Sequence, residues 1–257
     1  MLIDVHAHLY DKNLIEKIDE IILNAEKSRV QKIICVSDNP NSAKQVLKLS
    51  KKYENVYACL GVHPCEERLY TSEFADFLIN NKQNKKIVGI GEIGLDFHYE
   101  PFNKERQIFI FLEQLKLAND LKLPVQLHCR DAMKDMLELL RKNKKLLKHG
   151  GIMHCFNGSL DDLKVISELG LKISIGGVAT FKNAKTFQEL ISKISLDLIT
   201  FETDCPYLSP HPLRGKINEP KNLILTAKKV ADLKNLTLDE IIKISTENSL
   251  QVFKKLK

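Results

Sequence analysis

Histidines occur in pairs or singly at the ends of short apolar segments, where they could bind a metal ion. His6 and His8 stand two residues apart at the end of the first such segment, and Asp4 has the same spacing from His6. Residues two apart in an extended chain share one face, so both rings can approach a single ion. The pattern predicts a metal-binding pair; the alternative is an ordinary pair of surface histidines.

Carboxylates and further histidines follow four later apolar segments. They are Glu92, His128, His154, Glu202 and Asp204. Taken singly, each histidine is equally well explained as a hydrogen-bonded core residue. Taken together, four histidines and the carboxylates of Glu92 and Asp204 would meet at one end of a parallel barrel, where barrel enzymes keep their active sites. A bridging carboxylate and three further ligands per ion suit two divalent cations. The donors leave the metal open among Zn, Fe, Ni, Mn and Mg.

The segment around Glu92 also has the spacing G-x-G-x-x-G at residues 89–94. A dinucleotide-binding turn requires a helix to begin at these glycines and belongs to the first strand–helix unit. Here a loop up to Pro101 is expected, and the strand is the fourth. We therefore interpret the glycines as allowing tight backbone packing while Glu92 projects from the strand end.

The elements that must position these residues alternate along the chain. Apolar β-branched runs predict strands near 2–6, 32–36, 56–60, 87–91, 125–128, 152–154, 172–175 and 198–202. Apolar residues at helical spacing predict helices over 14–27, 42–52, 104–121, 132–141, 160–169, 184–194, 222–233 and 238–255. Eight strand-then-helix units indicate an α/β protein, a (β/α)8 TIM barrel forming a single domain over 1–257 with an extra C-terminal helix. An open doubly wound sheet is the alternative.

Composition excludes several classes of protein. The 257 residues are 44% hydrophobic and 28% charged, which excludes disordered and collagen-like chains. The net charge of +6 is only weak evidence for a phosphate-bearing partner. No apolar run reaches the roughly 18 residues of a membrane span, and no secretory signal precedes the six cysteines. We expect a reduced, cytoplasmic monomer in which Cys129 and Cys155 are small apolar fillers, with Cys205 a minor candidate for contact with the site.

Three further side chains could bind phosphate. His63 leaves the third strand in Gly61-Val62-His63-Pro64, Arg130 follows His128 by two positions, and Arg214 follows the eighth strand. Arginine suits bidentate phosphate binding. For His63 and Arg214 a loop-stabilising hydrogen bond is the alternative. Arg130 is expected on the same side as His128, or else paired with Asp131.

The chain closely resembles the TatD family of metal-dependent hydrolases. The resemblance spans the chain and rests on motifs in the family's order: His6-x-His8, Gly61-Val62-His63-Pro64, Gly91-Glu92-Ile93-Gly94-Leu95-Asp96, His128-x-Arg130, His154-x-Phe156, Glu202-Thr203-Asp204-x-Pro206 and Arg214-Gly215-Lys216. It implies a barrel that binds two divalent metals and hydrolyses DNA phosphodiesters, with 3′ exonuclease activity. It further implies that His6, His8, Glu92 and Asp204 hold one ion, and that Glu92, His128 and His154 hold the other.

The leading hypothesis is a metal-dependent deoxyribonuclease acting on DNA with two divalent ions, Mg or Mn in activity and Zn, Ni or Fe as alternatives. Glu92 and Asp204 are the candidate catalytic residues, with Asp204 as general base and Glu202 orienting a ligand histidine. A deacylase or amidohydrolase acting on an aminoacyl-tRNA ester or a small molecule is the alternative enzyme. A non-catalytic nucleic-acid-binding protein would leave the convergent ligands unexplained.

Overall fold

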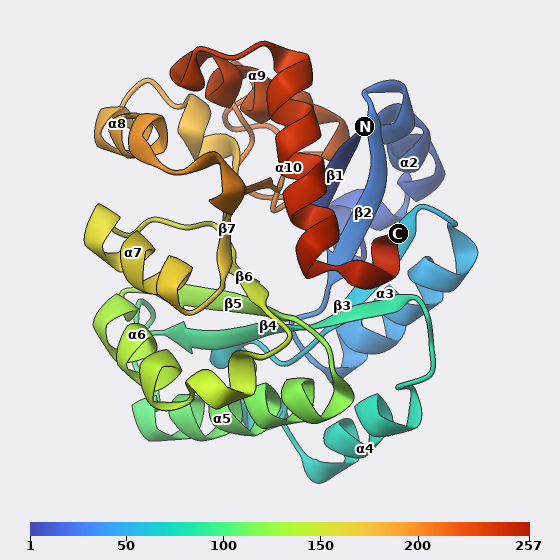
Figure 1. Cartoon of the computed structure of the whole chain (residues 1–257). Coiled ribbons are helices and arrows are strands. Elements are labelled where there is room, and N and C mark those ends of the chain that lie inside the picture. Colours follow the sequence, from blue (N-terminus) through green and yellow to red (C-terminus); the bar gives the residue numbers. More distant parts are fainter.

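Eight parallel strands form one sheet in which each strand pairs with its neighbour in the chain (Figure 1). The computed structural model describes residues 1–257. The strands are β1 (Leu2–Ala7), β2 (Val30–Val36), β3 (Val56–Leu60), β4 (Ile87–Asp96), β5 (Val125–Arg130), β6 (Gly151–Met153), β7 (Lys172–Ile175) and β8 (Ile199–Phe201). A parallel bridge between Ala7 and Cys205 joins the end of β1 to the segment that follows β8. The fold is therefore the predicted TIM barrel.

Helices follow the strands around the outside. They are α1 (Lys12–Ile15), α2 (Ile18–Lys27), α3 (Pro40–Lys52), α4 (Ser72–Asn80), α5 (Lys104–Leu121), α6 (Met133–Lys142), α7 (Leu160–Glu168), α8 (Lys185–Lys193), α9 (Leu223–Lys234) and α10 (Leu238–Val252). The helix predicted over 14–27 is two helices, and α4 lies in a stretch for which the sequence predicted none. No helix combines the length and the apolar character needed to cross a membrane.

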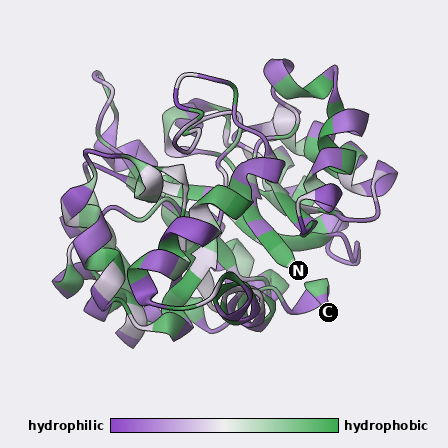
Figure 2. Cartoon of the chain, turned by 90° about the horizontal axis from the view of Figure 1, so that it is seen from above, coloured by the Kyte–Doolittle hydropathy of each residue, from purple (hydrophilic) through white to green (hydrophobic).

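The strands are buried because they are covered on both faces. Every residue of β1 and β4 is buried, as a strand must be when one face lines the barrel and the other lies under helices. The helices are apolar on one side only: α6, for example, buries Met136, Leu137 and Leu140. Figure 2 shows the same arrangement, with mostly hydrophobic strands inside and hydrophilic stretches on the surrounding helices.

The C-terminal segment closes one end of the barrel. Val252, Phe253 and Leu256 belong to an apolar cluster with Ile3 and Val88, which lie early in β1 and β4. The ammonium of Lys255 also donates to the carbonyl of Ile87, the first residue of β4, at 2.9 Å. This packing seals the end where the strands begin and is the role of the predicted extra C-terminal helix. The opposite end is left for polar residues.

Strand β4 is longer than the sequence predicted and changes the place of Glu92. The prediction ended this strand at Gly91, but β4 runs to Asp96, so Glu92 lies within the strand and not after it. Two glycines make this possible: a Cβ on Gly91 would stand 2.7 Å from the Cβ of Gln126, and Gly94 has φ of +153° with β5 backbone against it. No helix begins here, so these glycines do not form a dinucleotide-binding turn.

Candidate metal centre

The two histidines of β1 and the carboxylates of Glu92 and Asp204 form one group of converging atoms. The Nε2 atoms of His6 and His8 lie 3.2 Å apart. Glu92 Oε2 lies 3.5 Å from the first of these nitrogens and 3.9 Å from the second. Asp204 Oδ1 lies 3.7 Å and 3.3 Å from the same two atoms. Ligands on a tetrahedral ion at 2.0–2.2 Å stand roughly 3.4 Å apart, so these donor spacings suit a divalent cation.

A second group meets the other oxygen of the same carboxylate. Glu92 Oε1 lies 2.7 Å from His128 Nδ1 and 2.6 Å from His154 Nε2. These two nitrogens are 3.1 Å apart. The ring of His154 also stacks on the ring of His6, with centroids 4.1 Å apart, so the two groups are adjacent. Glu92 thus faces one pair of histidines with each of its oxygens.

Asp204 reaches the cluster through a turn after β8. The backbone N–H of Asp204 donates to the carbonyl of His6 at 2.9 Å, which ties this turn to β1. Asp204 itself has φ of +53°, a left-handed conformation that aspartate adopts more readily than most residues. The turn therefore brings the carboxylate against the rings of His6 and His8.

Hydrogen bonds to the outer ring nitrogens aim three of the histidines at the cluster. The Nδ1 of His6 lies 2.7 Å from Gln126 Oε1, and the Nδ1 of His8 lies 3.1 Å from the carbonyl of Val36. The Nε2 of His128 lies 2.9 Å from Asp96 Oδ2. Each partner is an acceptor, so each outer nitrogen carries the proton. The inner nitrogens face the carboxylates, and once a cation displaces their protons their lone pairs would point at it, as metal-binding histidines require.

His154 is the exception and carries the one buried polar atom without a hydrogen bond. Its Nδ1 has no partner within hydrogen-bonding distance. The nearest carboxylate oxygen is Glu202 Oε2, at 3.6 Å. Glu202 is itself fixed, because it accepts from the N–H of Cys155 at 2.7 Å and from the hydroxyl of Ser174. A small shift of the His154 ring would pair it with Glu202, the residue predicted to orient a ligand histidine.

Charge within the cluster is balanced by protons on the histidines. Burial would raise the pKa of Glu92, but His154 and His6, with the hydrogen bond to His128, lower it well below its usual value. Burial would lower the pKa of His8, yet Asp204 raises it to about 9. The pKa of His154 is likewise raised, by Glu92 and Glu202 against the effect of burial. Ionised carboxylates held by protonated imidazoles are the groups in which a cation can replace protons, so the residues present fit a divalent metal.

His63 joins the cluster as a neutral ring. Its Nε2 lies 3.8 Å from Glu92 Oε1, and its ring meets that of His128 edge-on at 4.2 Å. Burial, and next His128, lower its pKa to about 3. Since the N–H of Cys65 donates to Nδ1 at 3.1 Å, the ring proton sits on Nε2. His63 therefore presents a neutral N–H donor to the cluster.

The two arginines lie on aromatic rings and not on the cluster. The guanidinium carbon of Arg130 is 4.9 Å from the centroid of Tyr99, and that of Arg214 is 4.2 Å from the centroid of Phe181. No hydrogen bond or ion pair joins either arginine to the histidines or carboxylates. The alternative partner of Arg130, Asp131, instead pairs with His98 at 2.7 Å.

Other residues near the predicted ligands have structural contacts. Asp4 accepts from the N–H and hydroxyl of Thr203 at 2.9 and 2.6 Å. Burial raises the pKa of Asp4 to about 7. Cys129 and Cys205 pack against the main hydrophobic core, as apolar fillers do.

Sequence reasoning missed two residues that hold the histidines. Gln126 is fully buried and bonds both His6 and the carbonyl of Val5, at 2.7 and 2.6 Å. Asp96 is buried against His128. Both could have been found by alternation, because Gln126 stands two residues before His128 and Asp96 four residues after Glu92, so each shares a strand face with a predicted ligand.

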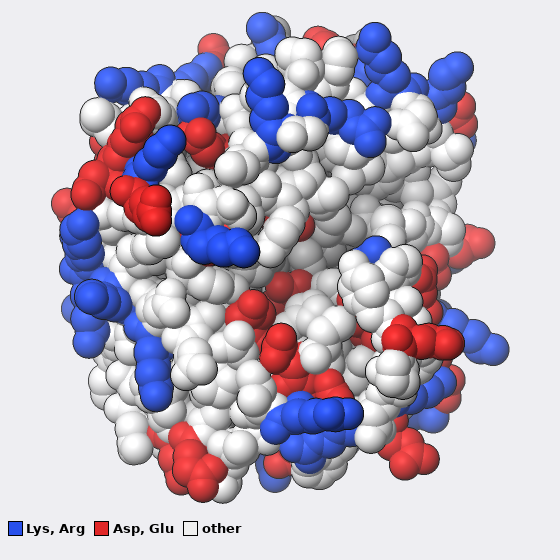
Figure 3. Space-filling model, turned by 180° about the vertical axis from the view of Figure 1, so that it is seen from behind, with Lys and Arg blue, Asp and Glu red and all other residues white.

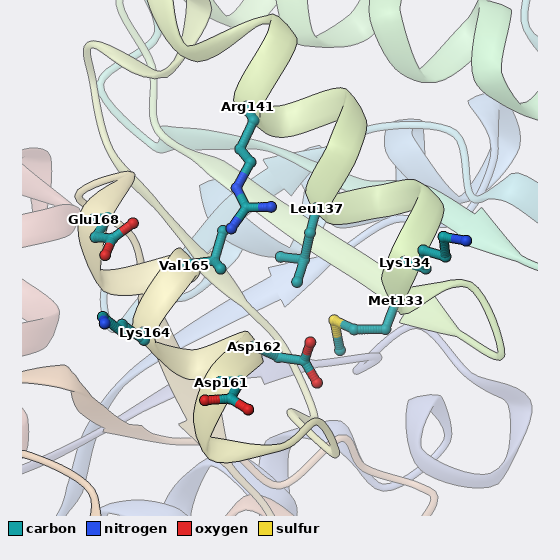
Figure 4. A pocket seen from close by; sticks show the side chains of 9 residues that line it. All are labelled: Met133, Lys134, Leu137, Arg141, Asp161, Asp162, Lys164, Val165 and Glu168. Atoms are coloured by element: carbon teal, nitrogen blue, oxygen red, sulfur yellow. The ribbon is translucent and has the colours of Figure 1, made fainter.

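The surface offers two contrasting hollows. Figure 3 shows a face hollowed near its middle, where acidic side chains gather, with lysine and arginine side chains around it. A separate groove of about 640 Å³ runs between α6 and α7. Its walls carry Met133, Leu137 and Arg141 from one helix and Asp161, Lys164 and Glu168 from the other (Figure 4). It includes none of the predicted site residues, so the cluster is the candidate site.

Comparison with known proteins agrees with this geometry. Residues 3–254 match the family model described as TatD related DNase. The chain is 37% identical over 254 residues to an uncharacterized metal-dependent hydrolase of Bacillus subtilis, covering 99% of each chain. Among solved structures, a TatD homologue from Escherichia coli superposes with a TM-score of 0.93 at 29% identity, covering 98% of each chain. A TatD-family hydrolase from Entamoeba histolytica gives 0.87 at 27% identity, covering 98% of this chain and 97% of that one. The chain therefore belongs to the TatD family of metal-dependent hydrolases.

Proposed function

We propose that this protein is a deoxyribonuclease that hydrolyses DNA phosphodiester bonds with two divalent cations, as a 3′–5′ exonuclease. The observation that carries the proposal is the position of Glu92, whose two oxygens face separate histidine pairs. One cation would be held by His6, His8, Glu92 and Asp204. The other would be held by Glu92, His128 and His154.

When bound, divalent cations neutralise negative charge on phosphate oxygens and lower the pKa of water. The mixed imidazole and carboxylate donors are compatible with Mg or Mn in activity and with Zn, Ni or Fe. Glu92 is the residue on which both sets of ligands depend. Its lowered pKa keeps it ionised at neutral pH, so both of its oxygens are unprotonated and free to bind a cation.

Asp204 is the proposed general base. Its pKa is lowered because His8 and His6 outweigh the effect of burial, so the carboxylate is ionised and can accept a proton from water. Its side chain is 13% exposed, whereas that of Glu92 is 5% exposed. Asp204 is thus the more accessible of the two carboxylates to water arriving from the open end of the barrel.

His63 is the proposed donor to a phosphate oxygen. Its proton sits on Nε2, within 3.8 Å of the cluster, and its low pKa keeps the ring neutral. A neutral donor beside ionised carboxylates can bind an anionic oxygen without drawing a proton away from Asp204. Arg130 and Arg214 would contact the nucleic acid further from the cluster, at the aromatic rings they cover.

Membership of the TatD family supports a metal-dependent hydrolase, and an assay with DNA tests the proposed substrate. Purified protein stripped of metal is incubated with 5′-labelled single-stranded DNA, with and without Mg²⁺ or Mn²⁺. We expect the DNA to shorten from its 3′ end only when metal is present. Glu92→Gln should abolish this hydrolysis with the fold retained, because a neutral amide of nearly equal volume cannot bridge two cations.

Two controls make the test specific. Glu138→Gln changes an exposed carboxylate on α6 and should hydrolyse DNA like the unaltered protein. A D-aminoacyl-tRNA is assayed in parallel with the same metals. Deacylation of the tRNA without any hydrolysis of DNA would overturn the nuclease assignment in favour of the esterase.

A further inference from the structure

A tyrosine at the open end of the barrel is both highly exposed and held in one orientation. Tyr99, three residues beyond the end of β4, is 62% exposed. Its hydroxyl accepts from Nη1 of Arg130 at 3.1 Å, and the guanidinium carbon lies 4.9 Å from its ring centroid. The ring of His98 meets it edge-on at 4.8 Å. An exposed aromatic fixed by neighbours in this way is ready to receive a flat partner.

Tyr99 and Arg130 lie at the ends of the two strands that carry Glu92 and His128. Arg130 follows His128 by two residues on β5, a distance of roughly 6.6 Å along a strand. Asp96, which bonds the ring of His128, stands three residues before Tyr99. Both strands thus bring Tyr99 and Arg130 to the end of the barrel that holds the cluster, where bases next to a phosphodiester at the cluster would lie.

We propose that Tyr99, backed by Arg130, is a stacking platform for an unpaired nucleobase beside the phosphodiester that is cleaved. This rests on the proposed function and adds to it the residue that recognises the base. One face of the ring is occupied by the guanidinium, and the exposure of Tyr99 leaves other ring surface open to solvent. Aromatic rings stack on any base, so this contact would distinguish a nucleotide with a base from one without, but would not distinguish one base from another. A base paired in a duplex has no free face, so the platform selects a frayed or single-stranded end.

A second aromatic–arginine pair provides a matched control. Phe109 on the outer helix α5 is 52% exposed, with the guanidinium carbon of Arg106 at 5.3 Å from its ring centroid. Its partner Arg106 bonds the carbonyl of Tyr70 at 3.1 Å and has no contact with the histidine cluster. If exposed aromatic pairs on this protein bound DNA non-specifically, Phe109 would do so as well as Tyr99.

The test compares oligonucleotides that differ by one base. A single-stranded, 5′-labelled DNA is prepared with all bases present, and again with an abasic nucleotide at either of the two positions next to the 3′-terminal bond. We measure kcat/KM with Mn²⁺ for the unaltered protein, Tyr99→Ala, Tyr99→Phe and Phe109→Ala. Binding of the same oligonucleotides is measured by fluorescence anisotropy with Glu92→Gln, with and without Tyr99→Ala.

We expect loss of the base to weaken binding and kcat/KM roughly five- to a hundredfold in the unaltered protein, the range of one base–aromatic stack. Tyr99→Ala should lower kcat/KM on intact DNA by a similar factor and remove the difference between intact and abasic DNA. Tyr99→Phe and Phe109→Ala should keep that difference. A merely structural role for Tyr99 would lower activity on both DNAs equally and keep the ratio.

The outcomes separate this proposal from the proposed function. If DNA is hydrolysed but Tyr99→Ala leaves the ratio of intact to abasic DNA unchanged, the platform is wrong and the nuclease stands. If the ratio of affinities for intact and abasic DNA depends on Tyr99 but no DNA is hydrolysed, Tyr99 does bind a base and the nuclease assignment is wrong. Failure of the unaltered protein with Mn²⁺ either to bind or to hydrolyse single-stranded DNA would overturn both.

Discussion

The Nε2 atom of His128 lies 2.9 Å from Oδ2 of Asp96, on the adjoining strand β4. Asp96 is 2% exposed, and although burial would raise its pKa, the hydrogen bond from His128 helps to lower it to about 2. The carboxylate is therefore ionised and fixes the proton of His128 on the nitrogen that faces away from Glu92. The other nitrogen is left to face Glu92 at 2.7 Å.

Asp96→Asn should weaken divalent cation binding by about tenfold. This is the lower end of the effect of losing the hydrogen-bond partner of a ligand histidine, because the amide oxygen can still accept from His128. Titration of metal-stripped protein with Mn²⁺ measures this. Asp131→Asn is the control, since Asp131 also accepts from a histidine, His98 at 2.7 Å, but is exposed and outside the cluster. Equal affinities for the two variants would show that Asp96 does not act through His128.

Gln126→Leu should lower both stability and metal affinity. The variant removes the amide that bonds His6 and the carbonyl of Val5 in a fully buried position, which costs roughly 1–3 kcal/mol in the free energy of unfolding. It also frees the ring of His6 to turn away from Glu92. Urea unfolding and Mn²⁺ titration give the two quantities.

Gln114→Leu separates these two effects. Gln114 is equally buried and bonds the N–H and carbonyl of Val62 at 2.8 and 3.0 Å, without contacting a histidine. It should lose similar stability and keep its metal affinity. If Gln126→Leu kept the same metal affinity as Gln114→Leu, the aiming of His6 by Gln126 would be refuted.

The alternation of strands and helices predicted the barrel because parallel strands covered on both faces must be short and apolar. It also predicted which polar residues meet, since the ends of parallel strands converge whatever their exact length. His6, His8, Glu92, His128, His154 and Asp204 are all within one cluster for this reason. Their role as metal ligands remains a prediction.

What the sequence did not predict depends on register across the barrel. Gln126 belongs to β5 and holds His6 from β1, 120 residues away, and no local pattern encodes that distance. The length of β4 was missed because the strand was expected to end at Gly91 and a loop to follow up to Pro101. The interpretation of its glycines as allowing tight packing is confirmed, against Gln126 and His128. Arg130 was expected to face the cluster by alternation, but it lies at the last residue of β5, where Tyr99 offers a nearer partner.

Phe253→Ala should destabilise the fold by about 3–5 kcal/mol without changing metal affinity. Phe253 is fully buried where the C-terminal segment closes the barrel, at the end opposite to the cluster. Phe109→Ala, which changes a ring that is 52% exposed, should cost far less. Unfolding free energies that were equal for the two variants would contradict the closing role of the C-terminal segment.

The bridging role of Glu92 is tested most directly by calorimetric titration of metal-stripped protein with Mn²⁺, for the unaltered chain and for Glu92→Gln. We expect two cations per chain for the unaltered protein. We expect Glu92→Gln, still folded by circular dichroism, to lose tight binding at both sites together, because both histidine groups face the same carboxylate. Saturation of the unaltered protein by a single cation, or two undiminished sites in Glu92→Gln, would show that Glu92 does not bridge two cations.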